Sequence, residues 1–340
     1  MSTAETNSPP ADAPALNAPV EGARRRAILT YVANYGSIIG MLIMIAIFSI
    51  AAPRAFPTLT NFLNILNQAS LTAIIAGGLT VVLIVGEMDL SIGYHGSLAG
   101  VLVTGLMVKQ GLPVWLAIVL VLGVGVVVGI VNGTIVTKVK VNSVIATLGI
   151  GSILVGLTFA YSTGVPIASG VPKSFTAIAL NRSMGIPNNI IISFVVLLML
   201  WLLVNRTDLG QQIQAVGGNM EAARLSGIRV DRVKIIAYIT AGLCASATGI
   251  LLASLIGSGT ASAADSYLLN AFAATFLGSA TLKDGEFHIP GTFIGVLIIG
   301  IGFNGLAILG APTFYQYIFQ GAILVIAVGL SSVARQLATR

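Results

Sequence analysis

The sequence predicts an all-α polytopic membrane protein with about ten transmembrane helices. Three observations lead to this fold class: 56% of the 340 residues are hydrophobic, only 8% are charged, and the mean hydropathy is +0.97. A soluble domain carries about 25% charged residues because its surface faces water. This chain has too few charges to cover a globular surface, so most of its outer surface must face lipid.

The apolar segments define the expected spans, because a transmembrane helix needs about 20 mostly apolar residues. The candidate spans lie near residues 31–52, 64–85, 95–109, 113–137, 143–163, 189–205, 233–256, 266–281, 290–309 and 313–331. The third and eighth candidates are the shortest. Short or Gly-interrupted segments at corresponding positions of two halves are typical of a transport pathway.

The distribution of basic residues predicts the orientation. Ten spans place both termini on one side, and with the N-terminus inside, 13 of the 17 Lys and Arg residues fall in cytoplasmic connections. This is the bias that the positive-inside rule describes. The basic excess does not indicate nucleic-acid binding, because the basic residues stand singly between apolar runs instead of forming a stripe.

Three regions are expected along the chain. Residues 1–27 are rich in Pro and Ala and are predicted to be a disordered cytoplasmic tail. Residues 28–331 form the transmembrane domain, with a cytoplasmic loop at 206–232, and residues 332–340 form a cytoplasmic C-terminal tail. The first apolar run exceeds the roughly 7–15 residues of a signal-peptide core, so we expect it to be an uncleaved span.

A loose internal duplication is one interpretation of residues 76–103 and 270–299. Each contains an apolar segment, a polar break bounded by glycines, and a second apolar segment. The breaks are residues 86–93 and 278–285. Duplicated halves are common in transporters, and chance similarity is the alternative.

Two acidic residues, Glu87 and Asp89, stand between apolar segments and are flanked by Gly86 and Gly93. A charge at the bilayer centre costs at least about 2.5–3.5 kcal/mol, so such residues normally face a cavity or a partner. One interpretation places them on a translocation path. The other is a polar turn at the cytoplasmic surface, in which Asp89 or Ser91 caps the next helix. The two have equal weight.

Other polar residues lie within the apolar segments and either line a hydrophilic path or hydrogen-bond neighbouring helices. For any single one we favour the second interpretation, in which each bond contributes roughly 0.6 kcal/mol. These residues are Asn64, Asn67, Gln68, Asn132, Thr147 and Asn304. On the fourth span, Gly125, Gly129 and Gly133 share one face, and small residues at this spacing let helix backbones approach closely.

The cytoplasmic loop 206–232 contains a predicted short helix at 219–227. Asn219 is a suitable N-cap, Ala222 and Ala223 favour helix, and Gly227 suits the left-handed position after the last turn. A surface helix between two spans is either a solvated loop helix or a docking element for a cytoplasmic partner.

The sequence lacks the motifs of several enzyme classes. It has no G-x-x-x-x-G-K-[ST] phosphate loop, no H-E-x-x-H and no G-x-S-x-G. Its two histidines, His95 and His288, are far apart in sequence and lack a metal-ligand pattern, and its one cysteine, Cys244, excludes a disulfide framework. We therefore expect no enzyme activity, metal or cofactor on this chain.

Four stretches carry a family resemblance. They are residues 86–93 (GEMDLSIG), residues 132–167 with their N-G, I-A-T-L-G and G-V-P-I elements, residues 215–228 (AVGGNMEAARLSGI), and the pairs Leu277-Gly278, Gly291-Thr292 and Asn304-Gly305-Leu306. Together they resemble the permease subunits of bacterial sugar ABC importers of the ribose/xylose/galactose type, over roughly residues 56–330. The chain departs from the family pattern at residues 279–287, where a Gly-rich turn is expected.

The resemblance implies a multi-pass permease in the bacterial inner membrane that translocates a monosaccharide or related polyol. It implies three partners: a second permease subunit, a cytoplasmic ATPase whose two nucleotide sites hold ATP and Mg, and a periplasmic sugar-binding protein. It also implies a coupling helix seated in a groove on the ATPase. The coupling residues are Asn219, Glu221, Ala222, Ala223, Arg224 and Gly227.

Three alternatives to this function stay open, and one of them, a membrane enzyme, predicts turnover by the purified chain alone. The same architecture could import a nucleoside, a branched-chain amino acid or a furanone-type signal. An ion-coupled secondary transporter is the alternative of another class, and it should place ionisable groups inside spans. Here only Glu87, Asp89 and Asp265 are candidates, all near predicted span ends.

Overall fold

The computed structural model describes residues 20–279, 281 and 285–338. These residues form thirteen α-helices, one π-helical turn and one small antiparallel hairpin. The elements are α1 (Val20–Ala51), α2 (Leu59–Ile84), α3 (Ile92–Val108), α4 (Val114–Thr134), η1 (Ile135–Val139), α5 (Ser143–Ser162), α6 (Lys173–Leu180), β1 (Arg182–Ser183), β2 (Ile186–Pro187), α7 (Asn188–Arg206), α8 (Asp208–Gly218), α9 (Met220–Leu225), α10 (Val230–Ile256), α11 (Asp265–Ser279), α12 (Ile289–Ile308) and α13 (Phe314–Ala338).

The chain is a polytopic membrane protein, and each of the ten predicted spans coincides with a helix. Within the described residues, six helices are long and apolar enough to cross a membrane: α2, α4 with η1, α5, α7, α10 and α12. Shorter apolar helices cover residues 36–51, 92–108 and 314–326. The sequence did not predict α6, α8 or the hairpin, which lie in connections where hydrophobic periodicity gives little signal. It also did not predict that the end of the fourth span, at η1, is π-helical.

The helical ends extend beyond the predicted domain boundaries. Helix α1 begins at Val20, before the boundary expected at residue 28, and α13 continues to Ala338, past the boundary at residue 331. Most of the predicted disordered tail, residues 1–19, lies outside the described residues.

Helices α2 and α10 form the centre of the bundle. Helix α10 packs on α2, α3 and α4, and α2 also packs on α7, α11 and α12. Apolar side chains of α2 such as Leu71, Ile74 and Leu79 are fully buried in the main core. The two helices therefore provide the fixed frame on which the shorter elements are placed.

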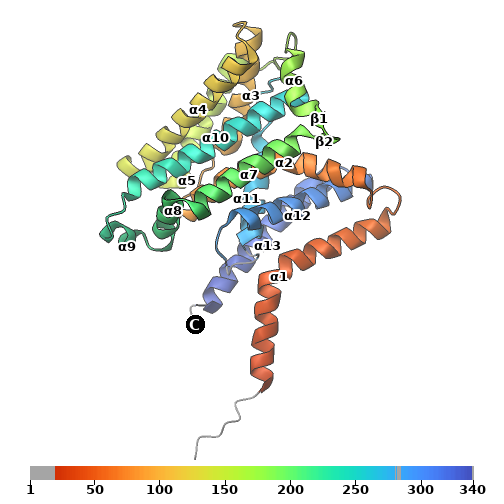
Figure 1. Ribbon diagram of the computed structural model, residues 1–340, viewed down its shortest axis with the longest axis vertical. Helices are drawn as coiled ribbons and strands as arrows, with labels where there is room; N and C mark the ends of the chain where they lie inside the picture. The colour runs from red at the N-terminus through yellow and green to blue at the C-terminus, as the bar shows by residue number, and fades with distance from the viewer. Residues whose placement is uncertain (1–19, 280, 282–284, 339–340) are drawn as a thin grey trace, which may run out of the picture.

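The connections collect at two opposite ends of the bundle (Figure 1). Helices α8 and α9 lie at one end, where Lys138 at the end of η1 pairs with Asp231 of α10 at 2.6 Å. Helix α6 and the β1–β2 hairpin lie at the other end, where Ile167 forms a β-bridge with Gly259. The first group consists of connections predicted to be cytoplasmic, and the second of connections predicted to be external.

Helices α3 and α11 are short and begin inside the bundle. Their 17 and 15 residues span about 25 and 22 Å at the usual rise, less than the roughly 30 Å of a hydrocarbon core. On α3, Gly96 lies against Ala245 and Gly249, which belong to the second half of α10. A Cβ on Gly93 would lie 3.0 Å from the carbonyl oxygen of Asp265 at the start of α11. The N-terminal turns of the two short helices therefore meet within the bundle.

Candidate functional site

The break between α2 and α3 is a non-helical segment, residues 87–91, that we call the 87–91 segment. It begins after Gly86, whose φ of +80° is a backbone conformation that favours glycine. Its last residue, Ser91, precedes the first turn of α3. Side chains from α4, α5 and α10 bind the segment, so three helices that are distant in sequence fix its position.

Asp89 and Ser91 form a buried polar cluster with Asn132 of α4. The Asp89 carboxylate accepts hydrogen bonds from the Ser91 amide at 2.9 Å and the Ser91 hydroxyl at 2.6 Å. The Asn132 amide donates to Ser91 Oγ at 2.9 Å and to Asp89 at 3.5 Å. Asp89 is 2% exposed. Its carboxylate therefore holds the chain at the start of α3, although neither Asp89 nor Ser91 caps the helix through a side-chain hydrogen bond. The choice between the path and the turn interpretation stays a prediction.

Glu87 forms an ion pair with Lys234 of α10 at 2.6 Å, and both side chains are largely buried. Tyr238, one turn further along α10, donates its hydroxyl to the Met88 carbonyl at 3.1 Å. From α5, the hydroxyl of Thr147 accepts a hydrogen bond from the Leu90 amide at 3.0 Å. The backbone of the 87–91 segment is therefore bound on two sides.

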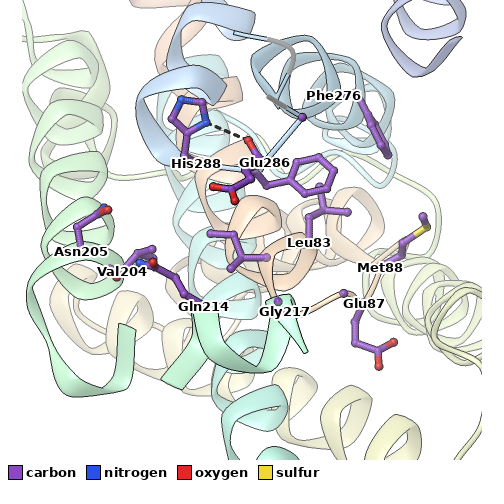
Figure 2. Close-up of a pocket in the computed structure, with 15 residues that line it drawn as sticks. Leu83, Glu87, Met88, Val204, Asn205, Gln214, Gly217, Phe276, Glu286 and His288 are labelled. Carbon is purple, nitrogen blue, oxygen red and sulfur yellow. Dashed lines mark hydrogen bonds between the residues drawn. The ribbon is translucent and has the colours of Figure 1, made fainter. Parts of the chain in front are cut away.

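A cavity of about 550 Å³ opens beside this segment at the end of the bundle that carries α8 and α9. Residues from the ends of α2, α7 and α11, from α8, and from the connection before α12 line it (Figure 2). The Glu286 carboxylate points into the cavity, and the Glu87 carboxylate points away from its centre. Residues 280 and 282–284 of the adjoining connection lie outside the described residues, so the predicted departure from the family's Gly-rich turn at residues 279–287 is not tested there.

The remaining predicted path residues lie at the opposite end of α2. Asn64 and Gln68 are exposed, and Asn67 is half-buried with its side-chain oxygen unpartnered. Asn304 of α12 exchanges two hydrogen bonds with Asn61 of α2, at 2.9 and 3.0 Å. The predicted path residues therefore divide into a cluster around the 87–91 segment and a polar face near the start of α2.

The predicted short helix is present as α9, and α8 precedes it. The Asn219 side chain caps α9 by accepting from the Ala222 amide at 2.9 Å. Ala223 is buried, Gly227 has a φ of +83°, and the Ile228 amide donates to the Ala223 carbonyl at 3.0 Å. Helix α9 is thus held in a compact turn before α10.

The exposed side of α9 carries charge. Glu221 and Arg224 are 3.5 Å apart, with side chains 67% and 56% exposed. Leu225 is 83% exposed. These side chains contribute little to the core and are free to contact a partner.

The glycines of α4 lie against α10. A Cβ at Gly125 would lie 2.7 Å from the Gly242 oxygen, one at Gly129 would lie 2.5 Å from the Ile239 Cα, and one at Gly133 would lie 2.8 Å from the Ile235 Cα. The three positions therefore hold the backbones of α4 and α10 in close contact. This contact places Asn132 next to the 87–91 segment.

Sequence reasoning missed several partners in these clusters. Lys234 and Tyr238 are four residues apart on α10 and so share one face. This spacing could have indicated that both side chains contact the same neighbouring segment. Asn61 was passed over because it lies at the edge of a predicted span. Within the described residues, no group of three His, Cys, Asp or Glu side chains could hold a metal ion.

Comparisons with known proteins identify the family of this chain. The family described as "Branched-chain amino acid transport system / permease component" matches residues 61–328. The ribose import permease protein RbsC of Escherichia coli (strain K12) is 37% identical over 308 residues, which cover 90% of this chain and 95% of that protein. No solved structure matches.

Two further relatives match most of the chain. The galactose/methyl galactoside import permease protein MglC of Escherichia coli (strain K12) is 32% identical, covering 91% of this chain and 96% of that protein. The xylose transport system permease protein XylH of Haemophilus influenzae is 31% identical, covering 88% and 96%. The chain belongs to the permease family of bacterial ABC importers. It is a multi-pass membrane permease component, and ATP hydrolysis belongs to a separate subunit.

Proposed function

We propose that this permease translocates a monosaccharide or related polyol delivered by a periplasmic binding protein. The observation that carries this proposal is the similarity, over 88–91% of the chain, to permeases named for ribose, galactose and xylose. The family description names branched-chain amino acids, so an amino acid is the second candidate substrate.

The chemistry of α2 favours a neutral solute. Helix α2 contains no Asp, Glu, Lys or Arg, and its exposed polar side chains near the start include Asn64 and Gln68. Side-chain amides donate and accept hydrogen bonds, so they match the hydroxyls of a sugar. An amino acid would bring two charges, for which α2 itself has no counter-charge.

We infer ten membrane crossings with both termini in the cytoplasm. One support is that contacts join connections assigned to the same side: Lys138 pairs with Asp231 on the predicted cytoplasmic side, and Ile167 bridges to Gly259 on the predicted external side. The other is that most Lys and Arg residues fall in the connections predicted to be cytoplasmic.

The packing also supports two related halves. Helices α2 and α3 are joined by the 87–91 segment, and α10 and α11 are joined by residues 257–264. Helix α2 packs on α11 and α12, as α10 packs on α3 and α4. If α2 and α3 correspond to α10 and α11, then the break at residues 86–93 corresponds to residues 257–264. The sequence comparison had instead paired it with residues 278–285.

We assign α9, with α8, as the docking element for a cytoplasmic ATPase with two nucleotide sites, which holds ATP and Mg. The support is that α9 is rigidly capped yet exposes Glu221, Arg224 and Leu225. The complete importer then has a second permease subunit, identical or a close paralogue, and a periplasmic binding protein.

Reconstitution tests the substrate and the class together. The permease, its ATPase and its binding protein are assembled in liposomes, and uptake of labelled ribose, xylose, galactose and leucine is measured. We expect ATP-dependent uptake of one sugar. Leucine uptake would favour the second candidate, whereas uptake by the permease alone under an ion gradient would support a secondary transporter.

Substitution of α9 tests the docking assignment. Glu221→Lys and Arg224→Glu should leave the amount of permease in the membrane unchanged, because both side chains are exposed. We expect ATPase co-purification and uptake to fall by about tenfold. The control is Lys138→Ala, which changes an exposed charge at the same end of the bundle. Normal uptake in both α9 variants would refute the assignment.

A further inference from the structure

The cytoplasmic helices contact both sides of the break between α2 and α3. On one side, Gly217 of α8 lies against the Ile84 carbonyl at the last residue of α2, where a Cβ would have no room. On the other side, Lys234 of α10 pairs with Glu87 at 2.6 Å. Helix α9 lies between α8 and α10 in the sequence, so its position is tied to both contacts.

The Glu87–Lys234 pair differs from the two other ion pairs among the described residues. Its side chains are 15% and 13% exposed. Those of Lys138–Asp231 are 60% and 40% exposed, and Glu221–Arg224 is exposed to a similar degree. Solvent screens exposed pairs strongly, whereas a buried charge that loses its partner is strongly unfavourable. The Glu87–Lys234 pair therefore resists separation.

The connection from α9 to Lys234 is short and internally bonded. The Gly227 and Ile228 amides donate to carbonyls of α9, and the Val230 amide donates to the Ile228 carbonyl. Helix α10 then runs through Lys234 and Tyr238 without a break. A displacement of α9 is thus expected to move the first turns of α10, and through the two side chains, the 87–91 segment.

The segment leads directly to the junction of the two short helices. Asp89 and Ser91 hold the start of α3, and Ser97 on the second turn of α3 donates to the Asp265 carboxylate at 2.7 Å. The Ala264 amide donates to Ser97 Oγ at 3.0 Å. Movement of the segment would therefore change the contact between α3 and α11 inside the bundle.

We propose that Glu87 is a positioning residue whose ion pair with Lys234 transmits displacement of α9 to the 87–91 segment and the α3–α11 junction. The proposal rests on the docking function assigned above to α8 and α9. In this proposal Glu87 couples ATP hydrolysis to transport and does not line the translocation path.

The test measures uptake and ATP hydrolysis in parallel on the assembled transporter in liposomes. The variants are Glu87→Lys, Lys234→Glu and the double variant with both changes, which restores opposite charges. For each single variant we expect uptake per ATP hydrolysed to fall by about tenfold, with ATPase co-purification retained. The double variant should recover most of the loss. The matched control is the Lys138→Glu and Asp231→Lys pair, in which neither change should alter the ratio.

The outcomes separate this proposal from the docking function. An unchanged uptake ratio in the single variants, or no recovery in a double variant that is present at normal levels, would overturn the transmission role. Loss of ATPase co-purification in Glu87→Lys would also overturn it, because the pair would then only support the docking surface. Failure of the docking function would show separately, as normal uptake in the α9 variants. If a single variant does not accumulate, the neutral double variant Glu87→Gln with Lys234→Met is measured in its place. A wild-type ratio of uptake to ATP hydrolysis in that variant would refute the transmission role of the ion pair.

Discussion

At the scale of single residues, the polar groups within the helices serve two different structural purposes. Asp89, Ser91 and Asn132 bind one another and fix the start of α3. Asn64 and Gln68 are exposed and bind no other part of the core. Substitutions in the two groups should therefore have different effects on stability and on transport.

Replacing Asp89 tests the first group. Asp89→Ala removes the acceptor for three donors and leaves buried groups unpaired, which costs about 1–3 kcal/mol of stability. The thermal denaturation temperature in detergent should fall accordingly. Asp89→Asn keeps one acceptor oxygen and should retain folding. Wild-type uptake by Asp89→Asn would favour the turn interpretation, and reduced uptake by a folded protein would indicate a role on the path.

Replacing the exposed amides tests the second group. Asn64→Ala with Gln68→Ala should leave the denaturation temperature unchanged and lower the uptake of a sugar severalfold, because hydrogen-bonding groups along the path are lost. The matched control is Asn304→Ala, which removes two buried hydrogen bonds to Asn61 and should lower stability by roughly 1 kcal/mol. Unchanged uptake in the Asn64–Gln68 variant would remove these residues from the path.

At the scale of elements, glycine spacing determines how closely α4 approaches α10. The backbones touch at Gly125, Gly129 and Gly133, and the closest opposing groups on α10 are backbone atoms. A backbone neighbour cannot rotate away as a side chain can. Helix separation is therefore the only relief for a larger residue.

Gly129→Leu should separate α4 from α10 and destabilise the permease by about 1–3 kcal/mol. The matched control lies on the same helix: Gly123 has nothing within 4 Å of its Cβ position, so Gly123→Ala should be neutral or stabilising. Denaturation temperature of the two purified variants is the measurement. Equal stability of both variants would contradict the packing role of the glycine face.

The short helices α3 and α11 show how a break inside the bundle can be stabilised. Each begins next to a carboxylate, Asp89 or Asp265, and negative charge is favourable near a helix N-terminus. Both carboxylates also accept hydrogen bonds from serine hydroxyls, at 2.6 and 2.7 Å. The polar groups at the starts of α3 and α11 are therefore bound by other protein groups and are not exposed to lipid, as a helix break inside a membrane requires.

At the scale of the whole molecule, the two ends of the bundle have different compositions. The α8–α9 end carries basic residues such as Lys138, Arg224 and Lys234, and the α6 end contains the small β-hairpin. Under the positive-inside rule this asymmetry predicts that the α8–α9 end faces the cytoplasm, where the partner proposed for α9 would lie.

Labelling of single cysteines tests this orientation. In a Cys244→Ala background, which removes the only native cysteine, Met184→Cys and Leu225→Cys place thiols at two exposed positions on opposite ends. A membrane-impermeant maleimide applied to intact spheroplasts should label residue 184 and leave 225 unlabelled until the membrane is permeabilised. The reverse pattern would invert the topology.

The spans could be predicted from sequence because a transmembrane helix is a local property of about 20 residues. The candidate coupling helix was also predictable, since Asn219 and Gly227 mark its ends in the chain itself. Helix α8 was missed because its amphipathic pattern lies between charged residues and lacks the apolar length of a span.

By itself the sequence determined the helical membrane class, the expected positions of the spans and the charge bias that predicts their orientation. Only the tertiary structure decided which polar residues meet. Lys234 is 147 residues from Glu87, and Asn304 is 243 residues from Asn61. Hydrophobic periodicity predicts which segments form helices. Which side chains pair between helices depends on how all the helices pack together. For this reason the sequence left the roles of Glu87 and Asp89 open, and the folded chain bound one to α10 and the other to the start of α3.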